Sequence, residues 1–420
     1  MSSRLAAAAA FPSTSVGRIA EVRLGKMLQP KPNVPTDSEV HYLRAGSLEG
    51  LTGDGALKKM WASPAERANY SVRRGDLIVA EGGDVGHSAF VPEVPNDTII
   101  QNSLHRIRPR SGDIRFLKYA LDTVYASGWL DVLCNKATFG HLTREKLSAL
   151  SIPWPSDNQQ RAIADFLDAE TARIDALIEK KRRLKQVLAT RLATLARSLV
   201  FDQPDTTKVR LGRVVSILPG YSFSSPDFRM DEENAIRLLR GINVAPGRCR
   251  WEEVAYLPRR QAHQHQTYML SPGDLVLGMD RPFINGGTRL ATIKETDVPS
   301  LLVQRVARIR AKEALNPKYL SFALHSDLFK DHCTPITTGV SVPHISADQI
   351  ADFHMPLPAR NVQNVIAERL TNEGTRTDVL RSQISRQIEL LTEHRQALIT
   401  AAVTGQVDVP GAFVRDSPPH

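Results

Sequence analysis

The sequence predicts an α+β fold class: two globular heads of mixed α and β structure, in a pseudo-two-fold arrangement, separated by two long helices that form an antiparallel coiled coil. Three observations support this prediction. The chain repeats itself, each copy begins with short apolar runs between glycines and prolines, and each copy ends with a long stretch almost free of both residues. Short bounded apolar runs are typical of strands, and long stretches without helix breakers are typical of helices.

The repeat consists of matched segments in the same order in both halves of the chain. Gly75–Val79 recurs as Gly273–Leu277, and His141–Thr143 recurs as His344–Ser346. From the second match onward the offset stays at 203 residues. A repeat of this length is a duplicated domain and not a solenoid unit. Two copies of one module on one chain suit a ligand that has two halves.

The first part of each copy predicts a small head. Asp76–Ala80, Thr98–Ile100 and Asp274–Leu277 are short apolar runs between turn residues, which is the pattern of strands. Short helices are expected over Ile114–Ser127 and Pro317–Lys330. Proline pairs at 153–155 and 356–358 close each head, because helices rarely run through such pairs.

A long helix is predicted after each proline pair. Residues 158–199 contain neither glycine nor proline, and residues 361–403 contain only Gly374. Apolar residues there recur at alternating steps of three and four, which is a heptad seam. Each seam needs a partner, and the other copy supplies one, so we expect antiparallel pairing. The predicted seam residues are Ile163, Leu167, Ile174, Leu177, Leu184, Leu188, Leu195, Ile366, Leu370, Leu380, Ile384, Leu391 and Leu398.

These features divide the chain into six parts. The first is a flexible leader, whose short alanine-rich run superficially resembles a signal peptide but ends at Pro12. The expected boundaries are leader 1–20, first head 21–155, central helix 156–204, second head 205–358, distal helix 359–405 and tail 406–420.

Composition and charge restrict the function. The 420 residues carry a formal net charge of +9, which favours a polyanionic partner such as nucleic acid. Three scattered cysteines form neither a disulfide framework nor a zinc site, so the reducing cytoplasm is the expected compartment. No run of 18 or more apolar residues is present, and we expect no membrane span.

The search for catalytic motifs finds none. The sequence has no glycine-rich phosphate loop, no dinucleotide fingerprint, no HExxH and no acidic-Pro-Pro-aromatic tetrapeptide. His263 and His265 lie in a polar stretch without a further ligand, which predicts a surface loop and not a metal site. We therefore expect a binding protein with no catalytic residue, no cofactor site and no metal site of its own.

Basic and polar side chains in the heads are the candidate contacts to DNA. Arginine donates two parallel hydrogen bonds and so suits both phosphates and guanine, although many of these side chains could be ordinary solvated charges. Two corresponding polar loops, 135–141 and 337–344, could approach a phosphate or serve as structural turns. The candidates are Arg73, Arg74, Arg106, Arg108, Lys136, Thr138, His141, Arg240, Arg281, Arg289, Thr338, Ser341 and His344.

The ordered motifs resemble the DNA-specificity subunit of type I restriction-modification systems. The resemblance covers about residues 20–410 and includes Gly75–Ile78, Gly273–Val276, Gln160–Asp168 and the ending Leu398–Val409. It implies that each head reads one half of a split asymmetric sequence in double-stranded DNA. It also implies that the helices fix the gap between the halves and dock the partner subunits.

The resemblance further implies a prokaryotic, cytoplasmic complex. Two modification subunits would use S-adenosylmethionine to methylate adenine, and two restriction subunits would use ATP and Mg²⁺ to translocate and cut DNA. Three alternatives remain open at this point: the specificity module of a bipartite type II restriction-methylation enzyme, a nuclease in its own right, and a purely structural coiled-coil scaffold.

Overall fold

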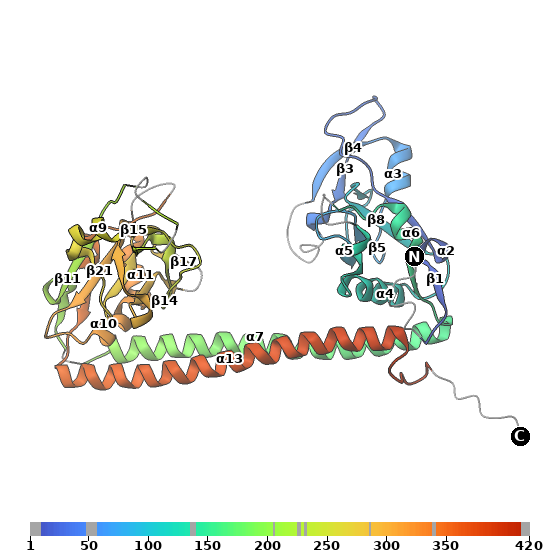
Figure 1. The fold of residues 1–420 in the computed structure, drawn as a ribbon. Helices are drawn as coiled ribbons and strands as arrows, with labels where there is room; N and C mark the ends of the chain where they lie inside the picture. The colour runs from blue at the N-terminus through green and yellow to red at the C-terminus, as the bar shows by residue number, and fades with distance from the viewer. Residues whose placement is uncertain are drawn as a thin grey trace, which may run out of the picture. The chain divides into compact units, whose positions relative to one another are not determined.

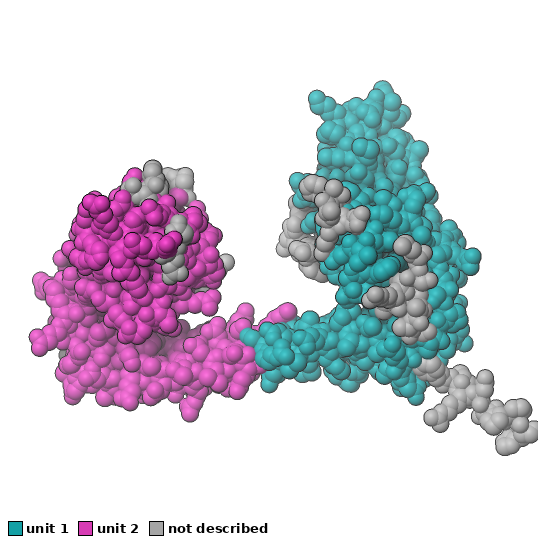
Figure 2. Space-filling model, in the orientation of Figure 1, with its two compact units in different colours: residues 1–181, 385–420 teal, residues 182–384 magenta. Residues whose placement is uncertain are grey.

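The protein is described here from a computed structural model that covers residues 10–47, 57–134, 140–204, 206–224, 228–230, 233–284, 287–337 and 342–412. The chain forms two compact units (Figures 1 and 2). Unit 1 comprises residues 1–181 and 385–420, and unit 2 comprises residues 182–384. The two long helices, α7 (Asp157–Phe201) and α13 (Arg360–Thr404), each contribute a segment to both units. Each unit is described by itself.

Unit 1 has two sheets covered by helices. The larger is antiparallel with strand order β2-β8-β5-β6, and the smaller has the order β4-β3-β7 with β3 and β7 parallel. A third pairing joins β1 to β9 at the end of the head. The strands are β1 (Ser13–Ser15), β2 (Ala20–Leu24), β3 (Ser38–Leu43), β4 (Lys58–Ala62), β5 (Leu77–Ala80), β6 (Ser88–Phe90), β7 (Ile99–Ile100), β8 (Leu104–Pro109) and β9 (Ser151–Pro153). The helices of the head are α2 (Val16–Ile19), α3 (Pro64–Tyr70), α4 (Ile114–Ala126), α5 (Trp129–Leu133) and α6 (Arg144–Ala149).

Unit 2 repeats this plan. Its larger sheet has the order β11-β21-β16-β19 and its smaller sheet the order β15-β12-β20, again with one parallel pair, and β10 pairs with β22 as β1 does with β9. The strands are β10 (Lys208–Arg210), β11 (Val215–Pro219), β12 (Ala235–Leu239), β13 (Val244–Ala245), β14 (Arg248–Cys249), β15 (Tyr256–Pro258), β16 (Leu275–Gly278), β17 (Phe283–Ile284), β18 (Gly287–Thr288), β19 (Leu290–Thr292), β20 (Ser300–Leu302), β21 (Val306–Ala311) and β22 (His354–Pro356). The helices are α8 (Leu211–Val214), α9 (Arg259–Ala262), α10 (Pro317–Leu324), α11 (Asp327–Cys333) and α12 (Ala347–Ala351). The predicted duplication of a mixed α/β head is confirmed.

The long helices begin and end close to the predicted positions and run antiparallel where they pair inside each unit. In unit 1, Asp175 on α7 pairs with Arg395 on α13 at 3.0 Å, and Lys181 Nζ donates to Gln387 Oε1 at 2.7 Å. In unit 2, residues 195–200 of α7 share one apolar core with residues 366–370 of α13. Each helix of 45 residues rises roughly 68 Å.

Most of the predicted seam is buried or half-buried, but three positions are wrong. Leu177, Leu184 and Leu380 are 42 %, 48 % and 40 % exposed. The seam continues instead through Thr171, Ile178 and Thr377, which are 5 %, 6 % and 8 % exposed. Two of these buried positions are threonines, which a search for apolar residues does not find, and Leu177 and Ile178 are adjacent apolar residues that spacing alone does not separate. Ile163, Leu167, Ile174, Ile366, Leu370 and Ile384 are buried, and Leu188, Leu195, Leu391 and Leu398 are half-buried.

The predicted leader and tail are partly wrong. Residues 1–9 and 413–420 lie outside the described residues, but 13–19 form β1 and α2. Phe11, Val16 and Ile19 are buried in the core of unit 1, as are Val409 and Ala412. These isolated apolar residues between polar ones carry too little periodicity to predict, yet burying them stabilises the end of each segment.

Gly374 is a weak point of α13 that substitution can remove. A Cβ built at this position meets no atom within 4 Å. Gly374→Ala is therefore expected to stabilise unit 2 by about 1 kcal/mol, because alanine loses less backbone entropy in a helix. Urea denaturation of the purified chain measures this. A lower midpoint in the alanine variant would show that the helix needs the glycine.

No helix in the described part of the chain is both long and apolar enough to cross a membrane. Within the same residues, no group of three or more His, Cys, Asp or Glu side chains is placed to hold a metal ion.

Candidate nucleic-acid interface

The central strand of each larger sheet ends beside two other segments, and together they form one edge of the head. In unit 1, Glu81 follows β5, its N–H donates to the carbonyl of Ser103, and its own carbonyl accepts from Leu142 N–H, both at 2.9 Å. In unit 2, the N–H of Met279 after β16 donates to Arg305 and its carbonyl accepts from Ile345, both at 3.0 Å. We call residues 26, 81–84, 101–103 and 141 the strand-end edge of unit 1, and residues 221, 279–281, 303–305 and 344 the strand-end edge of unit 2.

A further pair of hydrogen bonds fixes the correspondence between the two edges. Asn102 N–H donates to the carbonyl of Lys26, and Gln304 N–H donates to the carbonyl of Tyr221, both at 2.9 Å. The backbone of the edge is thus built the same way twice. Position by position, Lys26 corresponds to Tyr221, Ser103 to Arg305, and His141 to His344.

The side chains on these matched positions differ in charge. In unit 1 these side chains are Glu81 and His141. The Nδ1 atom of His141 lies 3.3 Å from the Glu81 carboxylate, and the His141 side chain is 55 % exposed. Unit 2 presents the exposed arginines Arg281 and Arg305, with Arg305 3.7 Å from Asp280. A carboxylate accepts from cytosine N4, whereas an arginine fork donates to guanine O6 and N7. The edge of unit 2 therefore presents donors of the kind that guanine accepts, whereas in unit 1 the Glu81 side chain is only 17 % exposed and lies against His141.

Arg281 occupies its position against the preference of its backbone. Its φ is +43°, in the left-handed region, and the corresponding residue of unit 1 is Gly83, with φ +78°. Left-handed backbone costs a residue with a side chain roughly 1 kcal/mol that glycine does not lose. Such strain is typical of functional sites. Of the predicted DNA contacts, Arg281 is the one that the structure places most clearly in a candidate interface.

Tyr221 gives the edge of unit 2 an aromatic surface. Its ring lies 4.3 Å from that of His265, 4.8 Å from that of Phe223 and 5.3 Å from that of Tyr268, measured between centroids. It remains 40 % exposed. At the matched position of unit 1, Lys26 is 7 % exposed, and its ammonium binds Glu66 at 2.5 Å and Gln29 at 2.8 Å.

Arg106 is buried and Arg108 half-buried, and both bind groups of the head itself, so the structure does not present either as a free surface contact. Arg108 donates two hydrogen bonds to Asp76, at 2.7 and 2.6 Å, and these bonds raise its pKa. Arg106 is 4 % exposed, donates to the carbonyl of Ser71 and lies 3.6 Å from Glu21; burial lowers its pKa. The arginine fork that suits phosphate suits a buried carboxylate equally well, so sequence could not separate the roles.

Arg240 and Arg289 also have structural contacts. Arg289 donates to the backbone carbonyls of Val244 at 3.0 Å, Asp280 at 2.7 Å and Gly241, so it ties three segments of unit 2 together. Burial lowers the pKa of its guanidinium. Arg240 Nη2 donates to the carbonyl of Glu253 at 3.0 Å. These hydrogen bonds direct both guanidinium groups to backbone carbonyls of the head itself and not toward a ligand.

The remaining predicted contacts divide into exposed residues and residues outside the described part. Arg73 and Arg74 are each 79 % exposed, near Asp76 at 3.8 Å and Glu93 at 3.6 Å respectively. His344 is half-buried and bridges to Asp280 in the backbone. Lys136, Thr138, Thr338 and Ser341 lie outside the described residues. Sequence reasoning did not single out Glu81, Asp280, Gln304 and Tyr221, which alignment of the strand ends between the two copies could have found.

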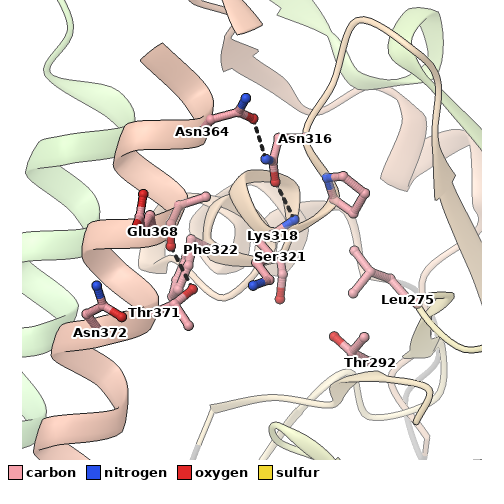
Figure 3. A pocket seen from close by; sticks show the side chains of 13 residues that line it. Leu275, Thr292, Asn316, Lys318, Ser321, Phe322, Asn364, Glu368, Thr371 and Asn372 are labelled. Carbon is pink, nitrogen blue, oxygen red and sulfur yellow. Dashed lines mark hydrogen bonds between the residues drawn. The ribbon is translucent and has the colours of Figure 1, made fainter. Parts of the chain in front are cut away.

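The junction between head and helix differs between the units. In unit 2 a cavity of about 750 Å³ lies between α10 and α13, with Lys318, Glu368 and Thr371 in its wall (Figure 3). At the same repeat offset in unit 1, Arg115 binds Asp165 and Asp168 on α7, each at 2.8 Å. The junction of unit 1 therefore carries ion pairs between head and helix at the positions that line a cavity in unit 2.

Two copies of one head, each joined to paired helices and each with a different polar edge, define a two-headed recognition protein. The family model described as the type I restriction modification DNA specificity domain matches residues 14–187 and 271–390, more than half of the chain. The chain belongs to this family. The match confirms the resemblance found in the sequence and does not favour the bipartite type II alternative.

Individual relatives agree with this assignment. The chain is 28 % identical to the type I restriction enzyme MjaVIII specificity subunit of Methanocaldococcus jannaschii over 64 % of this chain and 65 % of that protein. It is 34 % identical to the EcoAI specificity subunit of Escherichia coli over 38 % of this chain and 27 % of that protein. The matched region thus spans less than two thirds of either relative.

Solved structures share the fold at low sequence identity. One comes from a study of complex assembly and conformational transition of the type I R-M system, with a TM-score of 0.72, 16 % identity, and coverage of 94 % of this chain and 98 % of that chain. The HsdS subunit from Thermoanaerobacter tengcongensis has a TM-score of 0.50 and 17 % identity, with coverage of 94 % and 97 %.

Proposed function

We propose that this chain is the DNA-binding subunit of a type I restriction-modification complex, and that each head reads one half of a split, asymmetric sequence in double-stranded DNA. The observation that carries the proposal is the strand-end edge, where the same backbone hydrogen bonds join the same three segments in both units and the side chains differ. A shared backbone gives both heads the same approach to DNA. Because the side chains differ, each head recognises a different DNA sequence.

The partners and cofactors belong to the same proposal. The paired helices set the gap between the half-sites and dock two modification subunits, which use S-adenosylmethionine to methylate adenine. Two restriction subunits, which use ATP and Mg²⁺, complete the complex. The family assignment supports these roles, as does the absence of catalytic motifs in the sequence. The net charge of +9 supports the affinity for a phosphate backbone.

Exchange of one head tests the proposal. Residues 13–155, which include β1 and α2, are replaced by the matching segment of a second family member whose methylated sequence is known, and the methylome of cells with the full complex is sequenced. One half of the methylated sequence should change and the other half should stay, because each head has its own core and its own edge. A chimera with both halves altered would contradict independent heads, and cells of the parent strain without a split methylated sequence would contradict the function itself.

A further inference from the structure

The backbone of unit 2 does not need an arginine at position 281. Counted from the strand end, the matched position of unit 1 is Gly83, which takes the left-handed conformation without strain. The loops that follow differ in length, since Ala80 N–H donates to His87 in unit 1 and Gly278 N–H donates to Arg289 in unit 2. An arginine here opposes local stability. Its side chain therefore requires an explanation outside the fold of the turn.

The backbone around Arg281 is held on both sides. Its N–H donates to the carbonyl of Pro343 at 2.6 Å, and Asp280 pairs with His344 across the same segment. The next anchor is the 3.0 Å hydrogen bond from Ile345 to Met279. Arg281 thus projects from a fixed backbone position, which reduces the entropy lost when its guanidinium takes up one orientation on a ligand.

The guanidinium of Arg281 is exposed and available. The carboxylate of the adjacent Asp280 lies 3.7 Å from the guanidinium of Arg305. The backbone carbonyl of Asp280 accepts a hydrogen bond from Arg289. No hydrogen bond or ion pair joins the Arg281 side chain to another described residue. Gln304 and Arg305 of the same edge are also exposed. The guanidinium of Arg281 is therefore part of a polar surface whose hydrogen-bond donors are of the kind that bind base edges.

Phosphate and guanine both bind an arginine fork, and two observations favour guanine. Phosphate contacts carry no sequence information and serve both halves of a site alike, so matched positions would keep a cation in both heads. Here one head has an arginine and the other has no side chain. A base contact also demands one orientation, which the strained and anchored backbone supplies, whereas a phosphate tolerates many.

We infer that Arg281 is a specificity-determining residue that donates a bidentate contact to a guanine in the half-site bound by unit 2. The inference rests on the proposed function. It assigns to that half-site at least one G·C pair read from the major groove, with the guanine O6 and N7 as acceptors. The matched place in the other half-site is faced by Gly83 and is read by other residues of its edge.

The test uses the assembled methyltransferase complex and duplexes that carry the methylated sequence of its host. In a set of duplexes, the guanines of the half-site bound by unit 2 are replaced one at a time by 7-deazaguanine, which lacks the N7 acceptor. At one such guanine the native complex should lose about 5-fold in affinity, because one of the two hydrogen bonds of a bidentate pair is removed and the whole pair contributes about 1–3 kcal/mol of discrimination. Arg281→Gly, which loses both hydrogen bonds, should bind the unmodified site roughly 5- to 150-fold more weakly and should no longer distinguish 7-deazaguanine there.

The controls separate a guanine contact from other roles. Arg281→Gly should fold with unchanged or greater stability, because it restores the residue that unit 1 uses. Arg281→Lys keeps the charge but not the fork, so it should still lose discrimination, whereas a phosphate contact would survive it. Arg248→Ala, another exposed arginine of unit 2, should leave the guanine preference intact.

Three results overturn the inference. A uniform loss of affinity on all sequences in Arg281→Gly means a phosphate contact, an unchanged affinity means no contact, and a unit 2 half-site without a sensitive guanine means that another residue reads it. Failure of the proposed function would look different, because the native complex itself would then show no preference for a split sequence.

Discussion

Gln363→Leu is expected to destabilise unit 2 by about 3 kcal/mol while leaving unit 1 intact. The Gln363 side chain is fully buried at the start of α13, where it accepts from Asn316 N–H at 2.8 Å and donates to the carbonyls of Pro358, at 2.8 Å, and Ala314, at 3.0 Å. Leucine fits the volume but leaves three buried backbone groups without their partner. Each lost bond costs about 1 kcal/mol.

The second copy supplies an internal comparison. Gln160 accepts from Asp113 N–H at 2.9 Å and donates to Pro155 at 2.7 Å, so Gln160→Leu should cost unit 1 about 2 kcal/mol. Chemical denaturation followed by hydrogen exchange measures the two units separately. Gln383→Leu, at an exposed position of α13, is the matched control and should change little. If protection in unit 2 is unaffected by Gln363→Leu, the glutamine does not join head to helix.

The repeated motifs of the sequence turn out to be the structural frame of the fold. In Gly75-Asp76 and Gly273-Asp274, the glycines have φ of +87° and +92°, and each aspartate then accepts a backbone N–H from three residues earlier. The same carboxylates hold Arg108 and Arg310. Such turns depend on local chemistry, so sequence alone predicts the strand starts, the helix ends and the duplication.

The candidate site was much less predictable. Arg106, Arg108 and Arg289 match the composition of a DNA contact but are bound inside the head, because the fork of an arginine suits a carbonyl or a buried carboxylate as well as DNA. The strand-end edge joins residues far apart in sequence, such as Tyr221, Gln304 and His344. Their proximity depends on strand order and register, which no local pattern encodes.

Asp76→Ala is expected to destabilise unit 1 by about 3 kcal/mol. Asp76 is 4 % exposed and accepts from Arg108 twice and from the N–H of Arg73 at 3.0 Å. Without it, the buried Arg106 and its neighbour Arg108 face each other with Glu21 as their nearest described carboxylate. Removing one partner of a buried pair leaves an uncompensated charge, which costs more than the pair contributes.

Unit 2 again provides the comparison. Asp274 is similarly buried, but its partner Arg310 is 42 % exposed, so water stabilises the arginine when the carboxylate is lost and Asp274→Ala should cost less. Thermal unfolding with hydrogen exchange resolved by unit gives both values. Arg108→Ala decides between scaffold and DNA contact: a scaffold arginine lowers the stability of unit 1 and leaves sequence preference unchanged. A stable variant with weakened DNA binding would return Arg108 to the interface, where the sequence had placed it.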